Sequence, residues 1–200
     1  MARHYHIPLL ITFATILATC AWAQDGVLTN PTFLPDEGGE TPANWSFLDY
    51  KTGGEALYEP DGGRDGSGAL GIACATTEQR GAWRQRLQLE GMTHLYVSGF
   101  YRTEGLRQAG AATVRLTWLR GDRGWDFISD VRLSLQPSEE WAPFERVFTA
   151  PDEADAVTPE LFNFFTVGTV WWDQLNIREA TREELMEIAA RNLDLSLIHI

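Results

Sequence analysis

Short segments of alternating apolar and polar residues, separated by turns, constrain this chain more than any other feature of its sequence. They recur at regular spacing, and no helical period appears before Thr181. Alternation with a period of two is typical of a strand that packs one face on a core. The segments are Trp45–Tyr50, Glu55–Tyr58, Ala69–Ala75, Trp83–Leu89, His94–Arg102, Thr113–Leu119, Val131–Leu135, Trp141–Ala150, Leu161–Val167 and Thr169–Ile177. Evenly spaced short strands predict an all-β fold, an antiparallel β-sandwich of the jelly-roll type.

The same alternation predicts which side chains form the core. Leu70, Ile72 and Cys74 share one face of their segment, so Cys74 is expected to be a small buried residue rather than a reactive thiol. Tryptophan is frequent, and aromatic rings suit both sandwich cores and sugar-binding platforms. The tryptophans expected in the core are Trp45, Trp118 and Trp141.

Residues 1–23 have the features of a secretory signal peptide. A basic start is followed by an almost wholly apolar stretch, 7–19, and by Ala21-Trp22-Ala23, which matches an A-x-A cleavage site. The apolar stretch is shorter than the about 20 residues of a membrane span. We therefore expect a secreted or periplasmic protein with no membrane attachment after cleavage. The alternative is a lipoprotein anchored at Cys20, because Leu17-Ala18-Thr19-Cys20 resembles a lipobox.

Residues 24–179 are expected to form the sandwich, and residues 180–200 a tail outside it. Thr181 and Glu184 have the spacing of a helix capping box, and apolar residues follow at helical spacing. The tail is therefore predicted to be a short C-terminal helix or the start of a further region. The last six residues, "LSLIHI", resemble translated adaptor sequence, so we expect the chain to be a fragment of a longer protein.

Charge and motif content argue against several functions. The formal net charge of -12 argues against a nucleic-acid partner, because phosphate binding needs a basic patch. His94 is the only histidine of the expected sandwich, and neither zinc-ligand spacing nor a G-x-S-x-G elbow is found. Acidic residues cluster in loops such as 36–40 and 152–155, where solvated charge is expected. The domain itself is predicted not to be an enzyme.

An ordered set of short motifs runs along the expected sandwich. The set comprises Asn30-Pro31-Thr32-Phe33, Trp45, Gly68-Ala69-Leu70, Trp83-Arg84-Gln85, Val97-Ser98-Gly99-Phe100 with Arg102, Trp141, Phe148-Thr149-Ala150-Pro151 and "GTVWWDQLNI" at 168–177. This set resembles the CenC-like carbohydrate-binding modules of families 4, 9, 16 and 22. The resemblance implies a galactose-binding-like jelly roll that binds a polysaccharide, of the xylan or β-glucan class, in an aromatic groove without cleaving it. It also implies an accessory role, tethered to the catalytic domain of a secreted hydrolase. The alternative is a structural spacer or protein-interaction sandwich with no sugar site.

Sugar binding needs aromatic rings that stack on pyranose faces and polar groups that pair with hydroxyls. The candidate residues are Trp83, Gln85, Tyr101, Arg102, Trp125 and Asn163. Trp83, with Gln85 beside it, matches the position of a stacking tryptophan in the xylan-binding members of the family that the chain resembles. Trp125 lies in a polar loop, where a large apolar ring is costly unless it is used. Tyr101 and Phe100 point to opposite faces of one strand, so at most one of them can face a groove.

The resemblance also implies a structural calcium ion, with Asp173 and Asn30 as candidate ligands. Calcium takes six to eight oxygen ligands and favours carboxylates and backbone carbonyls. In the family, a Glu follows the N-terminal Phe and helps to hold this ion, but Leu34 stands at that position here. The sequence therefore leaves calcium binding open.

The adjacent pair Trp171-Trp172 precedes that aspartate on the expected last strand. The resemblance implies a bulge or register change near Asp173 that turns Val170 and Trp172 inward. Trp171 would then be the outward ring, packed under the N-terminal loop rather than stacked on sugar.

Overall fold

The computed structural model describes residues 27–106, 108–121 and 126–197, with side chains up to residue 190 in the last stretch. The predicted signal peptide (1–23), the alternative anchor Cys20 and the candidate ligand-binding residue Trp125 lie outside the described residues. These predictions therefore remain untested.

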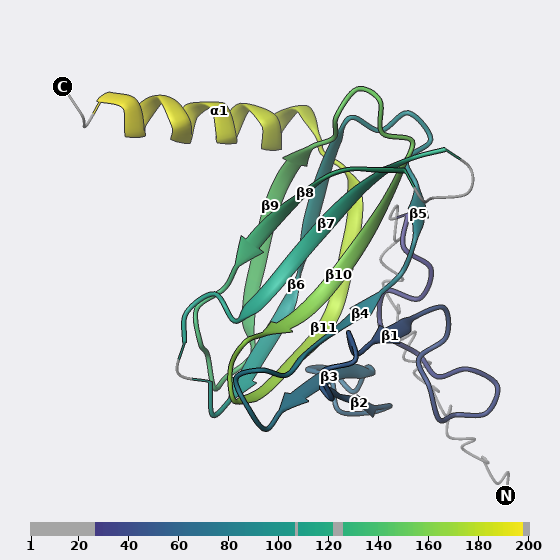
Figure 1. Cartoon of the computed structure of the whole chain (residues 1–200). Helices are drawn as coiled ribbons and strands as arrows, with labels where there is room; N and C mark the ends of the chain where they lie inside the picture. The colour runs from purple at the N-terminus through teal and green to yellow at the C-terminus, as the bar shows by residue number, and fades with distance from the viewer. Residues whose placement is uncertain (1–26, 107, 122–125, 198–200) are drawn as a thin grey trace, which may run out of the picture.

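Two antiparallel sheets pack face to face, as the strand spacing predicts (Figure 1). The first sheet has the order β1 (Ser46–Leu48), β4 (Arg80–Arg84), β10 (Ala156–Phe164), β7 (Ala112–Arg120) and β8 (Asp126–Ser134), and β5 (Leu87–Gln88) also pairs with β10. The second sheet has the order β2 (Glu55–Glu59), β3 (Ala69–Cys74), β11 (Gly168–Glu179), β6 (His94–Glu104) and β9 (Ala142–Thr149). The all-β jelly-roll prediction is confirmed.

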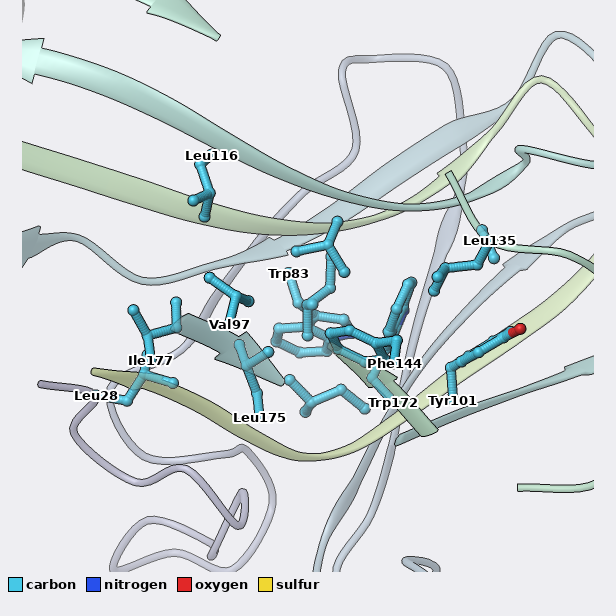
Figure 2. Close-up of a cluster of buried hydrophobic side chains, with 14 of the residues drawn as sticks. Leu28, Trp83, Val97, Tyr101, Leu116, Leu135, Phe144, Trp172, Leu175 and Ile177 are labelled. Atoms are coloured by element: carbon cyan, nitrogen blue, oxygen red, sulfur yellow. The ribbon is translucent and has the colours of Figure 1, made fainter. Parts of the chain in front are cut away.

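The core lies between the two sheets and is built from every second residue of the long strands (Figure 2). Trp118 and Trp172 are the largest of the fully buried side chains, and Trp45 and Cys74 are also buried, as predicted. Each fully buried large apolar side chain contributes about 1.5–3 kcal/mol relative to an exposed one. Trp141 is the exception, because it lies half-buried on the outside of the second sheet.

A proline explains where two predicted strands differ from the structure. The expected strand Trp83–Leu89 is divided into β4 and β5, and the interruption lies opposite Pro159 of β10. Proline has no N–H to donate, so the hydrogen-bonded ladder stops there and resumes in the same register. Pro159 also explains why the predicted strand began at Leu161, because proline is unusual inside a strand. β10 in fact begins at Ala156.

The expected register change on the last strand is confirmed. The pairing of β11 with β6 shifts between Asp173 and Asn176, and Gln174 there has a φ of 50°. Trp172 is turned into the core, and Trp171 lies on the outer face of the second sheet.

The ring of Trp171 packs over Gly71 of β3, where an added Cβ would lie 2.7 Å from the ring. Glycine is therefore needed at this close approach of two strands. That the N-terminal loop also covers this ring stays a prediction.

The predicted C-terminal helix is present as α1 (Arg182–Leu197) and extends away from the sandwich (Figure 1). Its capping box is formed: the backbone N–H of Glu184 donates to Thr181 Oγ1 at 3.3 Å, and the N–H of Thr181 donates to Glu184 Oε2 at 2.8 Å. Glu184 also makes a two-pronged ion pair with Arg178 of β11. Among the described residues, no helix has both the length and the apolar character that crossing a membrane requires.

The ion pair between Glu184 and Arg178 predicts a pH-dependent docking of α1. The hydrogen bond from Arg178 lowers the pKa of Glu184 from 4.5 to about 2, against an opposing effect of burial. Because the folded-state pKa is below the unfolded value, this stabilisation is complete above about pH 4.5 and is lost as the pH falls towards 2. The pair is partly exposed, so we expect Glu184→Gln to cost about 1 kcal/mol or less.

Amide hydrogen exchange in the first turns of α1 measures this effect. Glu184→Gln should increase exchange at neutral pH and remove its acid dependence, whereas the matched variant Glu183→Gln, in the same turn, should retain that dependence. Equal behaviour of the two variants would contradict a specific role for the ion pair.

Candidate functional site

The structure places Trp83 in the core rather than at a groove. The residue is 5% exposed, and its Nε1 donates to the carbonyl of Gly71 in the opposite sheet at 2.9 Å. Figure 2 shows the side chain pointing into the apolar cluster between the sheets. A buried indole needs one hydrogen-bond acceptor, and this carbonyl supplies it. The ring has no free face for a sugar, so the structure does not support the predicted stacking role.

Gln85 and Asn163 hold backbone segments together. Gln85 Oε1 accepts from the N–H of Thr29 at 2.9 Å, and its Nε2 donates to the carbonyl of Thr29 at 2.7 Å and to that of Asn44. Asn163 Nδ2 donates to the carbonyls of Ile72 and Gly168 at 3.1 and 2.9 Å. Both side chains are buried, so a structural role accounts for them and the predicted contact with sugar hydroxyls is not supported.

Tyr101 and Arg102 point to opposite sides of the second sheet. Tyr101 is buried against Trp172, and its hydroxyl donates to the carbonyl of Gln136 at 2.9 Å. Arg102 lies on the outer face, where its guanidinium packs 5.3 Å from the ring centroid of Trp141 and 5.4 Å from that of Trp171. The described candidates are therefore spread over the core and one outer face, and they do not form a common site.

The residues proposed as calcium ligands are used within the protein. Asp173 is 1% exposed; its Oδ2 accepts from the N–H of Arg64 and its Oδ1 from Ser67 Oγ, both at 2.7 Å. Burial raises the pKa of this carboxyl, and these hydrogen bonds oppose the rise. Asn30 Oδ1 accepts from the N–H of Leu34 at 2.6 Å, and its Nδ2 donates to the carbonyls of Leu34 and Ala43.

Donor groups of the protein therefore already pair with the side-chain oxygens of Asp173 and Asn30. Across the described ranges, no group of three His, Cys, Asp or Glu residues could hold a metal ion. N–H and O–H donors at the Asp173 carboxylate compete with a cation for its lone pairs, and calcium binding there stays a prediction.

The outer face of the first sheet brings together polar and aromatic side chains that the sequence did not group. Alternate residues of β4, β10, β7 and β8 point outward there, and Tyr50 covers them from the loop after β1. We call this set the aromatic–arginine face. Its members are Tyr50, Arg80, Arg84, Thr113, Arg115, Thr117, Asp130, Arg132, Thr158, Glu160, Phe162, Phe164 and Phe165.

Glu160 is the organising residue of this face. It is 4% exposed and accepts hydrogen bonds from Arg115 Nε at 2.6 Å, Thr117 Oγ1 at 2.9 Å and the Tyr50 hydroxyl at 3.3 Å. Arg115 Nη2 also donates to the Tyr50 oxygen at 2.9 Å. A buried carboxylate is tolerated when it is paired and hydrogen-bonded in this way. The result is a fixed network that joins β10, β7 and the loop after β1.

The electrostatics of this network keep Tyr50 protonated. Burial, together with the charge of Glu160, raises the pKa of the Tyr50 hydroxyl to about 12. Burial would lower the pKa of Arg115, but the hydrogen bond and the charge of Glu160 outweigh it, so that pKa is raised. The network therefore consists of a neutral hydroxyl, a cation and an anion near neutral pH.

Two aromatic rings and two guanidinium groups pack together on the outer face of the first sheet. Tyr50 stacks on Phe162 with centroids 5.6 Å apart and planes inclined by 30°. Arg80 lies 4.8 Å above the Tyr50 ring, and Arg115 lies 4.4 Å from the centroid of Phe162. Contacts of this type between cations and ring faces are attractive.

The backbone that carries Tyr50 is unusual. Tyr50 and Lys51 have φ values of 53° and 57°, a left-handed region that residues other than glycine seldom occupy. The N–H of Lys51 is held by Asp49 Oδ1 at 2.8 Å. Consecutive residues in such conformations persist only where the surroundings determine them, which is common at binding sites.

An exposed phenylalanine, Phe165, and the partly buried Phe164 lie at the end of the face beside these rings. Phe165 is 44% exposed and packs edge-on against Phe164, with centroids 4.6 Å apart. Arg80 also lies 5.4 Å from the Phe165 centroid. A large ring held rigidly in solvent is suited to stacking on another flat apolar surface.

No family model matches the sequence, and no curated protein matches it significantly. Solved structures share its fold. The CBM22-1 xylan-binding domain from Paenibacillus barcinonensis Xyn10C matches 80% of this chain and 98% of its own at a TM-score of 0.51 and 14% identity. The CBM22-1 and GH10 modules of Clostridium thermocellum xylanase 10B, complexed with xylohexaose, match 78% of this chain at a TM-score of 0.53 and 12% identity.

The fold is the jelly roll of carbohydrate-binding modules. It also matches a larger protein: the enzymatically active domain of tailspike protein 4 of bacteriophage CBA120 matches 78% of this chain at a TM-score of 0.62 and 11% identity. The chain spans 21% of that tailspike chain and 29% of the xylanase chain. At these identities the likeness establishes the fold.

The burial of Trp83 predicts that its removal acts on stability. Trp83→Ala should lower the free energy of unfolding by about 3–5 kcal/mol, as for other buried tryptophans. Denaturant unfolding, followed by circular dichroism, measures this change. A variant with unchanged stability and impaired glycan binding would contradict the core assignment.

The hydrogen bonds at Asp173 predict that calcium adds no stability. A ligand that binds only the native state raises the melting temperature in proportion to its occupancy. We expect the same melting temperature with millimolar calcium and with excess chelator. A rise with calcium that the chelator reverses would show that the loop at Arg64 and Ser67 rearranges to admit the ion.

Proposed function

We propose that this chain is a non-catalytic carbohydrate-binding module that binds a β-linked polysaccharide, of the xylan or β-glucan class, on its aromatic–arginine face. The observation that carries the proposal is the fixed network around Glu160 beside the exposed ring of Phe165 and the partly buried ring of Phe164. A sugar site needs these two components together, on one accessible surface.

Each component has a defined part in binding. The rings of Phe164 and Phe165 offer apolar surface to the C–H face of a pyranose. Arg84, exposed on β4, offers guanidinium donors to ring hydroxyls. Thr117 of β7 already donates its hydroxyl hydrogen to Glu160, so its oxygen offers an acceptor. Because Arg115, Tyr50 and Glu160 already fix one another, little conformational entropy is lost when a ligand arrives.

The arrangement is better suited to binding than to hydrolysis. Glycosidases use two carboxylates on either side of the scissile bond, one of which must supply a proton or attack the sugar. Glu160 instead accepts three hydrogen bonds and faces Arg115, and Asp130 pairs with Arg132 at 3.3 Å. Both carboxylates are therefore engaged as acceptors.

We propose further that the module serves a secreted hydrolase to which it is tethered. In the Clostridium thermocellum structure, a CBM22-1 module and a GH10 module occur together. Tethering converts the encounter of an enzyme with an insoluble polymer into an intramolecular event with a high effective concentration.

Affinity electrophoresis with xylan, β-glucan and galactan in the gel tests the proposal. We expect retarded migration with at least one polymer, and Phe165→Ala should reduce that retardation about tenfold in apparent affinity, since stacking on an aromatic ring contributes about 1–3 kcal/mol in comparable platforms. Met186→Ala, which removes another exposed apolar side chain on α1, is the matched control and should bind normally.

Two results would argue against this assignment. Unretarded migration across a broad glycan panel would favour the alternative, a structural spacer or protein-interaction sandwich. Binding that survives Phe165→Ala and is lost in Trp141→Ala would place the site on the outer face of the second sheet.

A further inference from the structure

The two sheets carry opposite charge, although the whole chain has a formal net charge of -12. The strands of the first sheet contain five arginines against three acidic residues. The strands of the second sheet contain three arginines against six acidic residues. The proposed binding face therefore belongs to the cationic sheet of an acidic protein.

Two cations on the aromatic–arginine face are not neutralised. Arg115 pairs with Glu160 at 2.6 Å and Arg132 with Asp130 at 3.3 Å. Arg80 and Arg84 have no ion-pair partner within the described part of the chain. The Arg80 guanidinium lies 4.8 and 5.4 Å from the ring centroids of Tyr50 and Phe165, and its buried Nε has no hydrogen-bond partner among the described residues.

The strand register sets these charges in a row. In the backbone register, Arg84 of β4 lies opposite Glu160 of β10, and Glu160 lies opposite Arg115 of β7. Arg115 in turn lies opposite Arg132 of β8. Neighbouring strands lie about 4.8 Å apart, so Arg84 and Arg115 are about 10 Å apart across the sheet. Glu160 lies between them but is buried and saturated, so the accessible charge of the row is positive.

We propose that the ligand carries carboxylates, and that the aromatic–arginine face binds a uronate-containing polysaccharide in preference to its neutral counterpart. This inference rests on the proposed function and names the ligand class. The planar guanidinium of arginine matches a carboxylate with two parallel hydrogen bonds and is weakly hydrated, so it pairs with carboxylates better than lysine does. Arg84 supplies the accessible fork, and Arg80 supplies a second uncompensated charge beside the exposed ring of Phe165.

The remaining surface limits which polyanions fit. A uniformly cationic protein would attract any polyanion. In this chain, the excess of acidic residues outside the first sheet repels polyanions that approach any other surface. Binding therefore needs carboxylates placed along one face, together with sugar rings for Phe164 and Phe165. The attraction is screened by salt, because the Debye length shrinks to about 8 Å at physiological ionic strength.

Polymers that differ only in charge give the sharpest test. The pairs are polygalacturonate against highly methyl-esterified galacturonan, and glucuronoxylan against the same xylan after carboxyl reduction. We expect the wild-type chain to bind the charged member of at least one pair more tightly in calorimetry at low salt, and to lose that preference as salt is added.

Arginine variants locate the effect. Arg84→Gln should weaken binding of the charged member about fivefold, the upper range for one exposed ion pair, and should weaken binding of the neutral member by a clearly smaller factor. Arg84→Lys keeps the positive charge but lacks the planar guanidinium. Its affinity for the charged member should lie between the affinities of the wild type and of Arg84→Gln. Arg146→Gln, which removes an exposed arginine from β9 of the second sheet, is the matched control and should behave as wild type.

The outcomes separate this inference from the proposed function. Equal binding of charged and neutral members, with both still reduced by Phe165→Ala, would overturn the uronate inference and leave a neutral sugar site. Equal binding of dextran sulfate and the uronates would indicate simple ion exchange and would also overturn it. Binding of no polymer at all would overturn both proposals.

Discussion

The packing of two inner sheet faces against each other is the constraint on which the rest of this structure depends. Successive side chains of a strand point to opposite sides, so each aromatic residue faces either the core or the surface. Trp83 and Trp172 are turned inward and Trp171 and Trp141 outward, although these four residues are equally apolar. The hydrophobic effect buries the rings that point inward, and only rings that point outward are accessible to a ligand.

The outer face of the first sheet depends in turn on a buried charge. Glu160 lies beneath the surface and is stable there because Arg115, Thr117 and Tyr50 donate to it. The hydrogen bond to Glu160 holds the Tyr50 side chain over Phe162, although the backbone of Tyr50 has an unfavourable φ. One buried carboxylate therefore accounts for the position of a loop, the orientation of an arginine and the shape of the proposed binding surface.

The sequence predicted the fold more fully than the site, for reasons that particular residues make clear. Alternation identified the inward residues of β6 and β7, and the capping box at Thr181 identified the start of α1. Pro159 concealed half of β10, the strand that carries Glu160. The outward position of Arg115 could be seen from its own segment, but its partner lies 45 residues away and no local pattern connects them. Trp83 is a candidate stacking residue because it matches the position of one in the family that the chain resembles. In the structure its indole donates to a core carbonyl, and Gln85 binds the backbone of Thr29.

The sequence by itself determined the all-β architecture, the inward faces of the strands and the capped helix, because each follows from local periodicity or from residues a few positions apart. The register change at Asp173 was implied by the family resemblance alone. Only the tertiary structure decided which outer face is cationic, that Gln85 and Asn163 clamp backbone segments, and that the oxygens of Asp173 are filled by Arg64 and Ser67. These features arise from contacts between segments distant in the chain. They are set by the register in which the strands pair, and that register is fixed only when the two sheets close on a common core.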